Sequence, residues 1–347
     1  MTNRSWLILA DGYLTARNAK TAHGVIRYSR DRIAAVIDRA NAGSDVSEVL
    51  PELNRSAPVV ASVAEGLVHG PTSLLLGVAT PGGWIPPEWR GWILEAIENG
   101  LEIVNGLHTF LNDDIEFVAA AEDRGVRLWD VRQPPEGIPL FTGKSLEIPQ
   151  RTVLTVGSDC AVGKKTTALE VAAAGTEREV VTEFVATGQT GVLIAGKGMA
   201  IDRVISDFVS GAAEMLVCDA DPVAKVLIVE GQGSLWHPAY AGVTLGLLHG
   251  SAPEVLILCH EAGRDAIEEP PYSKLPPIED MIATYEDMTV PVRGARVACI
   301  SLNCRRVDPS ERRGAIDAME NRTGLPVGDV WAGDAPKLWD AVAAALA

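Results

Sequence analysis

Short apolar runs alternate along the chain with segments whose apolar residues recur at helical spacing. In the first third, the runs predict strands at residues 5–10, 25–28, 32–37, 58–61, 73–78, 103–105 and 126–130. Two segments between them, 88–100 and 112–124, have the spacing of helices that bury one face. Strands that alternate with helices are typical of α/β domains. The pattern therefore predicts a Rossmann-like N-terminal domain over residues 1–135.

The alternation resumes after a stretch rich in proline and glycine at 132–139, where we expect the domain boundary. Beyond it the pattern predicts strands at 152–156, 179–186, 225–229, 254–259 and 296–302, and helices at 201–216, 278–286, 309–322 and from residue 337. Almost continuously apolar strands indicate a sheet covered on both faces. Residues 143–347 are thus predicted to form a C-terminal α/β domain like that of P-loop NTPases, with a doubly wound, mostly parallel sheet.

One glycine-rich segment joins a predicted strand to a predicted helix. Gly157, Gly163 and Lys164 match the G-x-x-x-x-G-K spacing of a Walker A loop in that context. Such a turn directs backbone N–H groups and the positive end of a helix dipole at one point, which suits a phosphate. The predicted cofactor-binding residues are Gly157, Ser158, Asp159, Cys160, Ala161, Val162, Gly163, Lys164, Lys165, Thr166 and Thr167.

One position departs from the Walker pattern. Lys165 stands where nucleoside triphosphatases place the Ser or Thr that holds Mg²⁺. Each helical residue turns the side chain by about 100°, so Thr166 should not replace that ligand. The substitution favours a loop that holds a phosphorylated ligand without cleaving it, and we expect no resident metal.

Three further glycine-containing turns follow predicted strands of the second domain. Because parallel strands end at one edge of a sheet, these turns should converge beside the P-loop. Glu230 and His237 are the candidate catalytic residues, although Glu230 has an alternative interpretation as a structural carboxylate. Arg264 is suited to bind a substrate carboxylate with two hydrogen bonds. The candidate substrate-binding residues are Thr187, Gly188, Gln189, Thr190, Gln232, Ser234, His260, Glu261 and Arg264.

Composition narrows the possible partners. Over 347 residues, 47% are hydrophobic and 22% charged, and the formal net charge is -16, which opposes binding to nucleic acids and anionic membranes. We expect a cytoplasmic protein, because the sequence shows no secretory leader pattern and no long apolar run. The five cysteines form no C-x-x-C pair, and Cys160, in the P-loop, is the thiol to test for reactivity.

Several segments together resemble one known family. GSDCAVGKKTTALE, FVATGQTGVLIAGKG, DFVSGAAE, EGQGSLWHPAYAGVTLGLLHG and the early AKTAHGVIRYS are similar to segments of a two-domain P-loop family long catalogued as a domain of unknown function. Its characterised activity is D-glutamate N-acetyltransferase, which uses acetyl-CoA in D-amino-acid catabolism. The resemblance implies that the P-loop grips the phosphates of coenzyme A, and that no phosphoryl transfer or Mg²⁺ is needed.

Two other functions stay open on the sequence. The P-loop and the Glu-Gly-x-Gly segment at 230–233 also look similar to dethiobiotin synthetase, which would make the protein an ATP- and Mg²⁺-dependent ligase or kinase. A non-catalytic sensor of a nucleotide or of coenzyme A is the other alternative. As partners we expect a small amino-acid substrate and other copies of the chain in a homo-oligomer.

Overall fold

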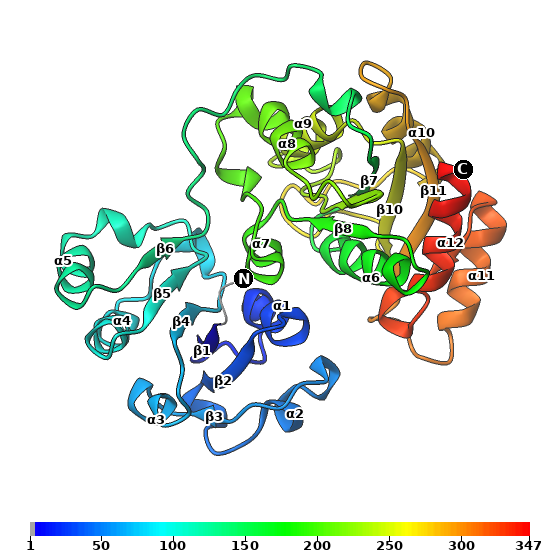
Figure 1. The fold of residues 1–347 in the computed structure, drawn as a ribbon. Coiled ribbons are helices and arrows are strands. Elements are labelled where there is room, and N and C mark those ends of the chain that lie inside the picture. The colour runs from blue at the N-terminus through cyan, green and yellow to red at the C-terminus, as the bar shows by residue number, and fades with distance from the viewer. Residues whose placement is uncertain (1–3) are drawn as a thin grey trace. The chain divides into compact units, whose positions relative to one another are not determined.

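The structure is a computed structural model that describes residues 4–347. It contains two compact units (Figure 1). The first comprises the residues up to Pro134 together with Gly188–Arg203, and the second comprises Pro135–Thr187 and Val204–Ala347. Gly188–Arg203 falls within the predicted second domain, whereas the structure groups this segment with the first unit.

The first unit contains a six-stranded sheet in the order β3-β2-β1-β4-β5-β6, and all its strand pairs are parallel. This is the strand order of Rossmann folds, as the sequence predicted. The strands are β1 Ser5–Leu9, β2 Arg32–Ile37, β3 Val59–Val60, β4 Ser73–Leu76, β5 Glu102–Asn105 and β6 Leu128–Asp130. The helices are α1 Lys20–Tyr28, α2 Val46–Val49, α3 Val63–Leu67, α4 Trp89–Glu98, α5 Ile115–Arg124 and α7 Gln189–Ala195.

The strand predicted at 25–28 is wrong, because these residues end helix α1. Ala22, Val25 and Ile26 are fully buried at helical spacing, so the short apolar run is part of one helical face. Helix α7 was not predicted. It contacts α1 within the first unit, where the hydroxyls of Thr190 and Thr21 lie 3.1 Å apart.

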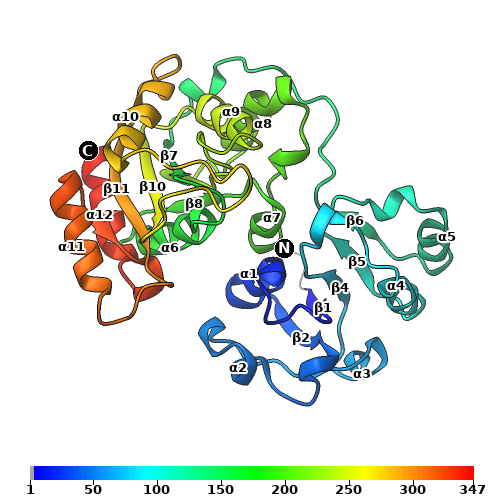
Figure 2. The same ribbon diagram turned by 180° about the vertical axis from the view of Figure 1, so that it is seen from behind.

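The second unit contains another six-stranded, all-parallel sheet, in the order β12-β11-β10-β7-β9-β8. The strands are β7 Arg151–Gly157, β8 Thr182–Val185, β9 Val226–Val229, β10 Val255–Glu261, β11 Arg296–Asn303 and β12 Val327–Gly328. The helices are α6 Lys164–Glu177, α8 Val209–Cys218, α9 Ala241–Ser251, α10 Ile278–Thr289, α11 Arg312–Thr323 and α12 Ala335–Leu346. Helices α6 and α12 pack together against the sheet, and α8 packs on α9 (Figure 2). Both units thus have the predicted α/β class.

The helix predicted at 201–216 begins only at Val209, after two short 3₁₀ turns. Helix α9 was missed because its glycines interrupt the apolar pattern. Those glycines serve close packing, since a Cβ on Gly246 would lie 2.3 Å from Val209 Cγ1 and one on Gly250 would lie 2.1 Å from the Ser210 carbonyl oxygen. The α8 backbone therefore approaches α9 where side chains would prevent it.

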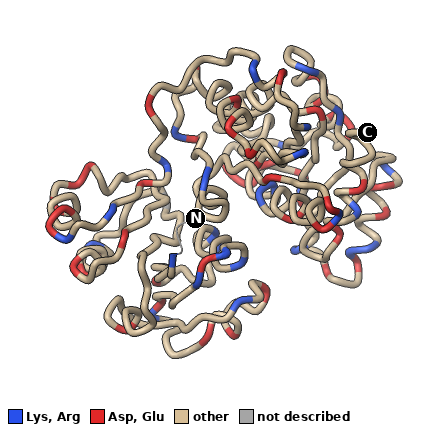
Figure 3. Tube along the Cα trace, in the orientation of Figure 1, with Lys and Arg blue, Asp and Glu red and all other residues tan. Residues whose placement is uncertain are grey.

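Acidic and basic positions are interspersed in both units (Figure 3). Among residues 4–347, every helix is too short or too polar to cross a bilayer.

Candidate functional site

The P-loop follows β7 at the carboxyl edge of the second sheet, and α6 begins directly after it at Lys164. Ala161 and Gly163 both have left-handed backbone conformations, with φ of 55° and 115°. A Cβ on Gly163 would lie 2.3 Å from the Trp331 ring, so the position requires glycine both for its φ and for space. These two backbone conformations fit the turn expected of a phosphate-binding loop, and phosphate binding itself stays a prediction.

Lys164 is buried in this turn, and its Nζ donates a hydrogen bond to the Asp159 carbonyl oxygen at 2.7 Å. Burial lowers the pKa of Lys164, while the neighbouring Cys160, Cys259 and Asp159 act in the opposite direction. An anion bound in the turn would likewise stabilise the charged ammonium. An anionic ligand in the turn would thus offset part of the effect of burial on Lys164.

One of the two hydroxyl groups that follow Lys165 is engaged within the second unit. Thr167 is fully buried and its Oγ1 lies 2.7 Å from Ser301 Oγ on β11, so this hydroxyl serves the packing of α6 on the sheet. Lys165 occupies the second position of α6 and is half-buried. The expectation that the P-loop holds no Mg²⁺ stays a prediction.

Two of the predicted substrate-binding residues, Ser234 and His260, contact Ser158 at the start of the P-loop. The Ser234 hydroxyl donates to the Ser158 carbonyl oxygen at 2.9 Å, and His260 Nδ1 lies 2.8 Å from Ser158 Oγ. Burial, followed by the charge of Arg264, lowers the pKa of His260 to about 4. His260 is therefore neutral near pH 7, and its ring nitrogen is engaged with the loop.

Arg264 lies at the centre of a buried acidic network. Its Nη1 donates to Asp159 Oδ2 at 2.6 Å, and its Nη2 donates to Glu261 Oε2 at 2.7 Å and to Glu268 Oε2 at 3.2 Å. Arg306 contacts Glu261 and Glu268 from outside. The guanidinium predicted to bind a substrate carboxylate is thus engaged by carboxylates of the chain itself, and it anchors Asp159 in the P-loop.

Glu230 lies at the end of β9 and is 3% exposed. Its Oε2 accepts a hydrogen bond from the Thr187 backbone N–H at 3.1 Å, and the Thr187 hydroxyl donates to the Glu230 carbonyl oxygen at 2.6 Å. Gln232 Nε2 donates to Thr187 Oγ1 at 3.3 Å. These contacts join the turns after β8 and β9, which agrees with the structural interpretation of Glu230 and leaves its chemical role a prediction.

His237 is 2% exposed and stacks at a tilt on Tyr240, with ring centroids 4.5 Å apart. Its Nδ1 accepts a hydrogen bond from the Ala239 backbone N–H at 3.3 Å, whereas its buried Nε2 lacks a hydrogen-bond partner among the described residues. A ring nitrogen of His237, Cys160 Sγ and an Asp159 carboxylate oxygen lie within 4.8 Å of one another. The turn after β9 therefore brings His237 to the P-loop, as the sheet-edge argument predicted.

Gly188, Gln189 and Thr190 belong to the first unit. There Gln189 begins helix α7, and a Cβ on Gly106 would lie 3.3 Å from Gln189 Cγ. Their predicted contact with a substrate stays a prediction.

Sequence reasoning missed Tyr285 on α10. Its buried hydroxyl donates to the Gly157 carbonyl oxygen at 2.7 Å and lies 3.5 Å from the Leu235 backbone nitrogen. Burial raises the pKa of Tyr285, so the hydroxyl stays a donor. Ile278, Met281 and Tyr285 are buried along one face of the helix. The tyrosine hydroxyl on this otherwise apolar face was the feature of the sequence that could have indicated a buried hydrogen bond.

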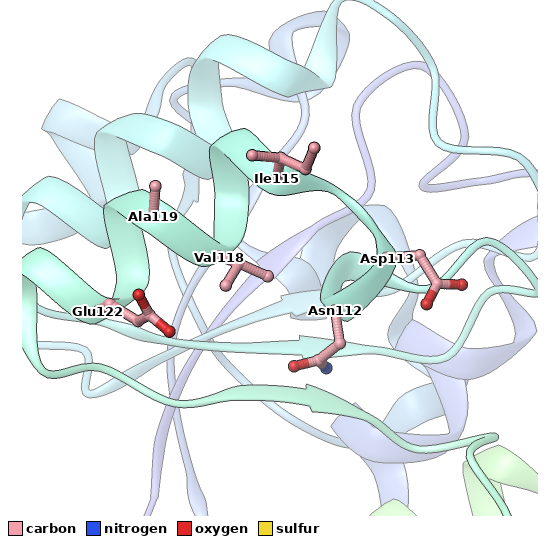
Figure 4. Close-up of a pocket in the computed structure, with 6 residues that line it drawn as sticks. All are labelled: Asn112, Asp113, Ile115, Val118, Ala119 and Glu122. Carbon is pink, nitrogen blue, oxygen red and sulfur yellow. The ribbon is translucent and has the colours of Figure 1, made fainter.

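Two surface pockets accompany these features. One, of about 310 Å³, is lined by Glu261, Ala262, Gly263, Arg264, Ala266, Glu268 and Arg306. The other, of about 280 Å³, lies over α5 in the first unit and is lined by Asn112, Asp113, Ile115, Val118, Ala119 and Glu122 (Figure 4). Only the first pocket includes residues that the sequence had selected.

Two family models match the chain, and the P-loop model includes the Gly188–Arg203 segment that the structure groups with the first unit. Residues 139–339 match a P-loop domain of unknown function, DUF1611_C, and residues 39–134 match its Rossmann-like N-terminal partner, DUF1611_N. The chain belongs to the DUF1611 family. A crystal structure of a DUF1611 family protein from Anabaena variabilis superposes with a TM-score of 0.94 at 37% identity, covering 99% of this chain and 100% of the other.

Two relatives carry a functional name. A protein from Tritonibacter scottomollicae named D-glutamate N-acetyltransferase is 36% identical over 331 residues, which cover 94% of each chain. A protein of the same name from a Pseudoalteromonas species is 40% identical over 271 residues, covering 77% of this chain and 80% of the relative. The family and fold implied by the sequence motifs are thereby confirmed.

Proposed function

We propose that this member of the DUF1611 family is an acyltransferase that moves the acetyl group of acetyl-CoA to the amine of D-glutamate, in D-amino-acid catabolism. The observation that carries the proposal is a P-loop with a buried lysine, Lys164, followed by Lys165 at the position of the Walker hydroxyl. The names of two relatives, which cover most of this chain, supply the substrate.

The P-loop serves as an anchor in this proposal. Coenzyme A presents a pyrophosphate and a 3′-phosphate, and the turn at 157–163 offers N–H groups, Lys164 and the start of α6 to one such group. Lys165 adds a second positive charge at the position of the Walker hydroxyl. The phosphate is held and never transferred, so the reaction consumes no ATP.

Transfer of the acetyl group requires a neutral amine and donors for the oxyanion that forms on the carbonyl. Because the Ala239 N–H points at Nδ1, the neutral His237 ring carries its proton on Nε2 and is suited to donate to an anion. Glu230 is then the remaining sequence-derived candidate for the base.

Turnover tests the proposal directly. Purified protein is mixed with acetyl-CoA and, in separate reactions, D-glutamate, L-glutamate or D-aspartate, and free thiol and product mass are followed. We expect thiol release that depends on D-glutamate, together with N-acetylglutamate. A parallel reaction with ATP and Mg²⁺ tests the ligase or kinase alternative, and coenzyme A binding without any turnover would support a sensor instead.

The Glu230→Gln variant separates catalysis from binding. It should lose turnover but keep coenzyme A affinity if Glu230 handles the amine proton. Full turnover in Glu230→Gln would leave this carboxylate with a structural role only.

A further inference from the structure

The Cys160 thiol is close to His237 in the second unit and has no role in the proposed transfer. Its Sγ lies within 4.8 Å of a ring nitrogen of His237 and of an Asp159 carboxylate oxygen. Cys160 is half-buried and is not part of a disulfide, while His237 is 2% exposed. Small reagents from solvent can thus reach a thiol that lies beside a buried imidazole.

The hydrogen bonds of His237 define what its ring offers to this cluster. Since Nδ1 accepts from the Ala239 N–H, the neutral ring has its proton on Nε2, and that buried donor has no hydrogen-bond partner among the described residues. Glu269 Oε2, at 3.7 Å, is beyond hydrogen-bonding distance. A buried donor without a partner is costly, and an anionic sulfur nearby would satisfy it.

The surrounding charge favours an anion over a metal cation. Cys160 lies in the turn before the N-terminus of α6, and a negative charge on Cys160 would favour the charged form of Lys164, whose pKa burial lowers. Asp159 Oδ2 is already bound by Arg264 Nη1 at 2.6 Å. A metal-binding histidine normally donates its second ring N–H, but here the Ala239 N–H points at that second nitrogen.

We propose that Cys160 and His237 form a thiolate–imidazole pair, which makes Cys160 a covalent modification site for hydroperoxides and small thiol reagents. With hydrogen peroxide, the thiolate attacks one oxygen and the O–O bond breaks. The leaving hydroxide takes a proton to become water, and Cys160 becomes a sulfenic acid. A low-molecular-weight thiol then displaces water to give a mixed disulfide, and a second thiol molecule restores Cys160 as its own disulfide forms.

The modified sulfur would lie in the turn that holds a phosphate in the proposed function. Oxidation and anion binding should therefore exclude each other. The reactivity of the thiol itself does not depend on the acetyl acceptor, so a failed acetyltransferase assay would leave this inference standing.

The test is the labelling rate of each cysteine. The intact protein is treated at neutral pH with methyl methanethiosulfonate, and modification is followed by peptide mass spectrometry. Cys218, which is exposed at the end of α8, is the internal control. We expect Cys160 to react at least about tenfold faster than Cys218, and inorganic pyrophosphate to slow Cys160 alone. Equal rates for the two cysteines would overturn the proposal.

Two substitutions of His237 test whether its ring activates the Cys160 thiol. His237→Ala should slow labelling of Cys160 by about tenfold, since it removes the donor that would stabilise the Cys160 thiolate. His237→Gln retains an amide donor and should keep most of the rate. Unchanged labelling in His237→Ala would refute the role of the imidazole. If His237→Ala does not fold, a tenfold or greater loss in a folded His237→Gln would contradict donor rescue.

Discussion

Replacing Tyr285 by phenylalanine tests whether the P-loop is held in place from α10. The change removes one hydroxyl, which donates to the Gly157 carbonyl oxygen at 2.7 Å and lies 3.4 Å and 3.5 Å from the backbone nitrogens of Gly157 and Leu235. The phenyl ring keeps the edge contact with Trp236, at 5.1 Å between centroids. Any effect therefore comes from the hydrogen bonds rather than from lost packing.

The expected loss of stability in Tyr285→Phe follows from the burial of this hydroxyl. Leaving a buried acceptor without its donor costs about 1–3 kcal/mol. For a unit of this size, each kcal/mol lowers the melting temperature by about 2–4 °C. A loss of about 2 kcal/mol thus predicts a decrease of about 4–8 °C. Because the hydroxyl joins the start of the P-loop to the turn after β9, coenzyme A should also bind more weakly.

Differential scanning fluorimetry and isothermal titration with coenzyme A measure the two effects. Tyr272→Phe is the matched control, because it also removes a tyrosine hydroxyl, but from a residue that is 62% exposed. We expect the control to stay within about 2 °C of the parent protein. A Tyr285→Phe protein as stable as Tyr272→Phe would refute the account of how the loop is held.

Three further predictions concern the same unit. His260 has a pKa of about 4 in the folded protein, so it binds a proton less readily there than in the unfolded chain. The free energy of unfolding should therefore fall by about 3 kcal/mol as the pH drops from about 6.5 toward 4. In His260→Asn, the midpoint of urea unfolding should fall less over the same pH range. Arg264→Met leaves buried carboxylates unpaired and should cost about 3–5 kcal/mol in urea unfolding, against about 0–1 for Arg313→Met, whose pair with Asp317 is exposed. Lys165→Thr restores the Walker hydroxyl, so it should weaken coenzyme A binding and make ATP binding depend on Mg²⁺. Titrations with each ligand that show neither change would contradict the role given to Lys165.

The sheet strands other than β12, and the convergence of the β7, β9 and β10 turns, could be predicted because they depend on local apolar runs and on one rule for parallel sheets. Helix α9 could not, since its glycines report packing against α8 that only the fold supplies. The grouping of Gly188–Arg203 with the first unit likewise depends on contacts distant in sequence, such as Arg132 with Asp202.

In the candidate site, too, the contacts made by a side chain could not be predicted from local sequence. Sequence could place Arg264 and His237 at the sheet edge, but not their partners. Three carboxylates surround Arg264, and the Ala239 N–H fixes the tautomer of His237. Both facts change the chemistry expected of these side chains, because one becomes an anchor of the P-loop and the other a donor.

One reaction mixture tests the central claim, that the P-loop anchors coenzyme A for acetyl transfer and does not drive phosphoryl transfer. It contains the protein, isotopically labelled acetyl-CoA, D-glutamate, ATP and Mg²⁺, and is analysed by mass spectrometry over time. The account predicts labelled N-acetylglutamate in proportion to free coenzyme A, with ATP intact. Consumption of ATP while labelled acetyl-CoA persists would contradict it.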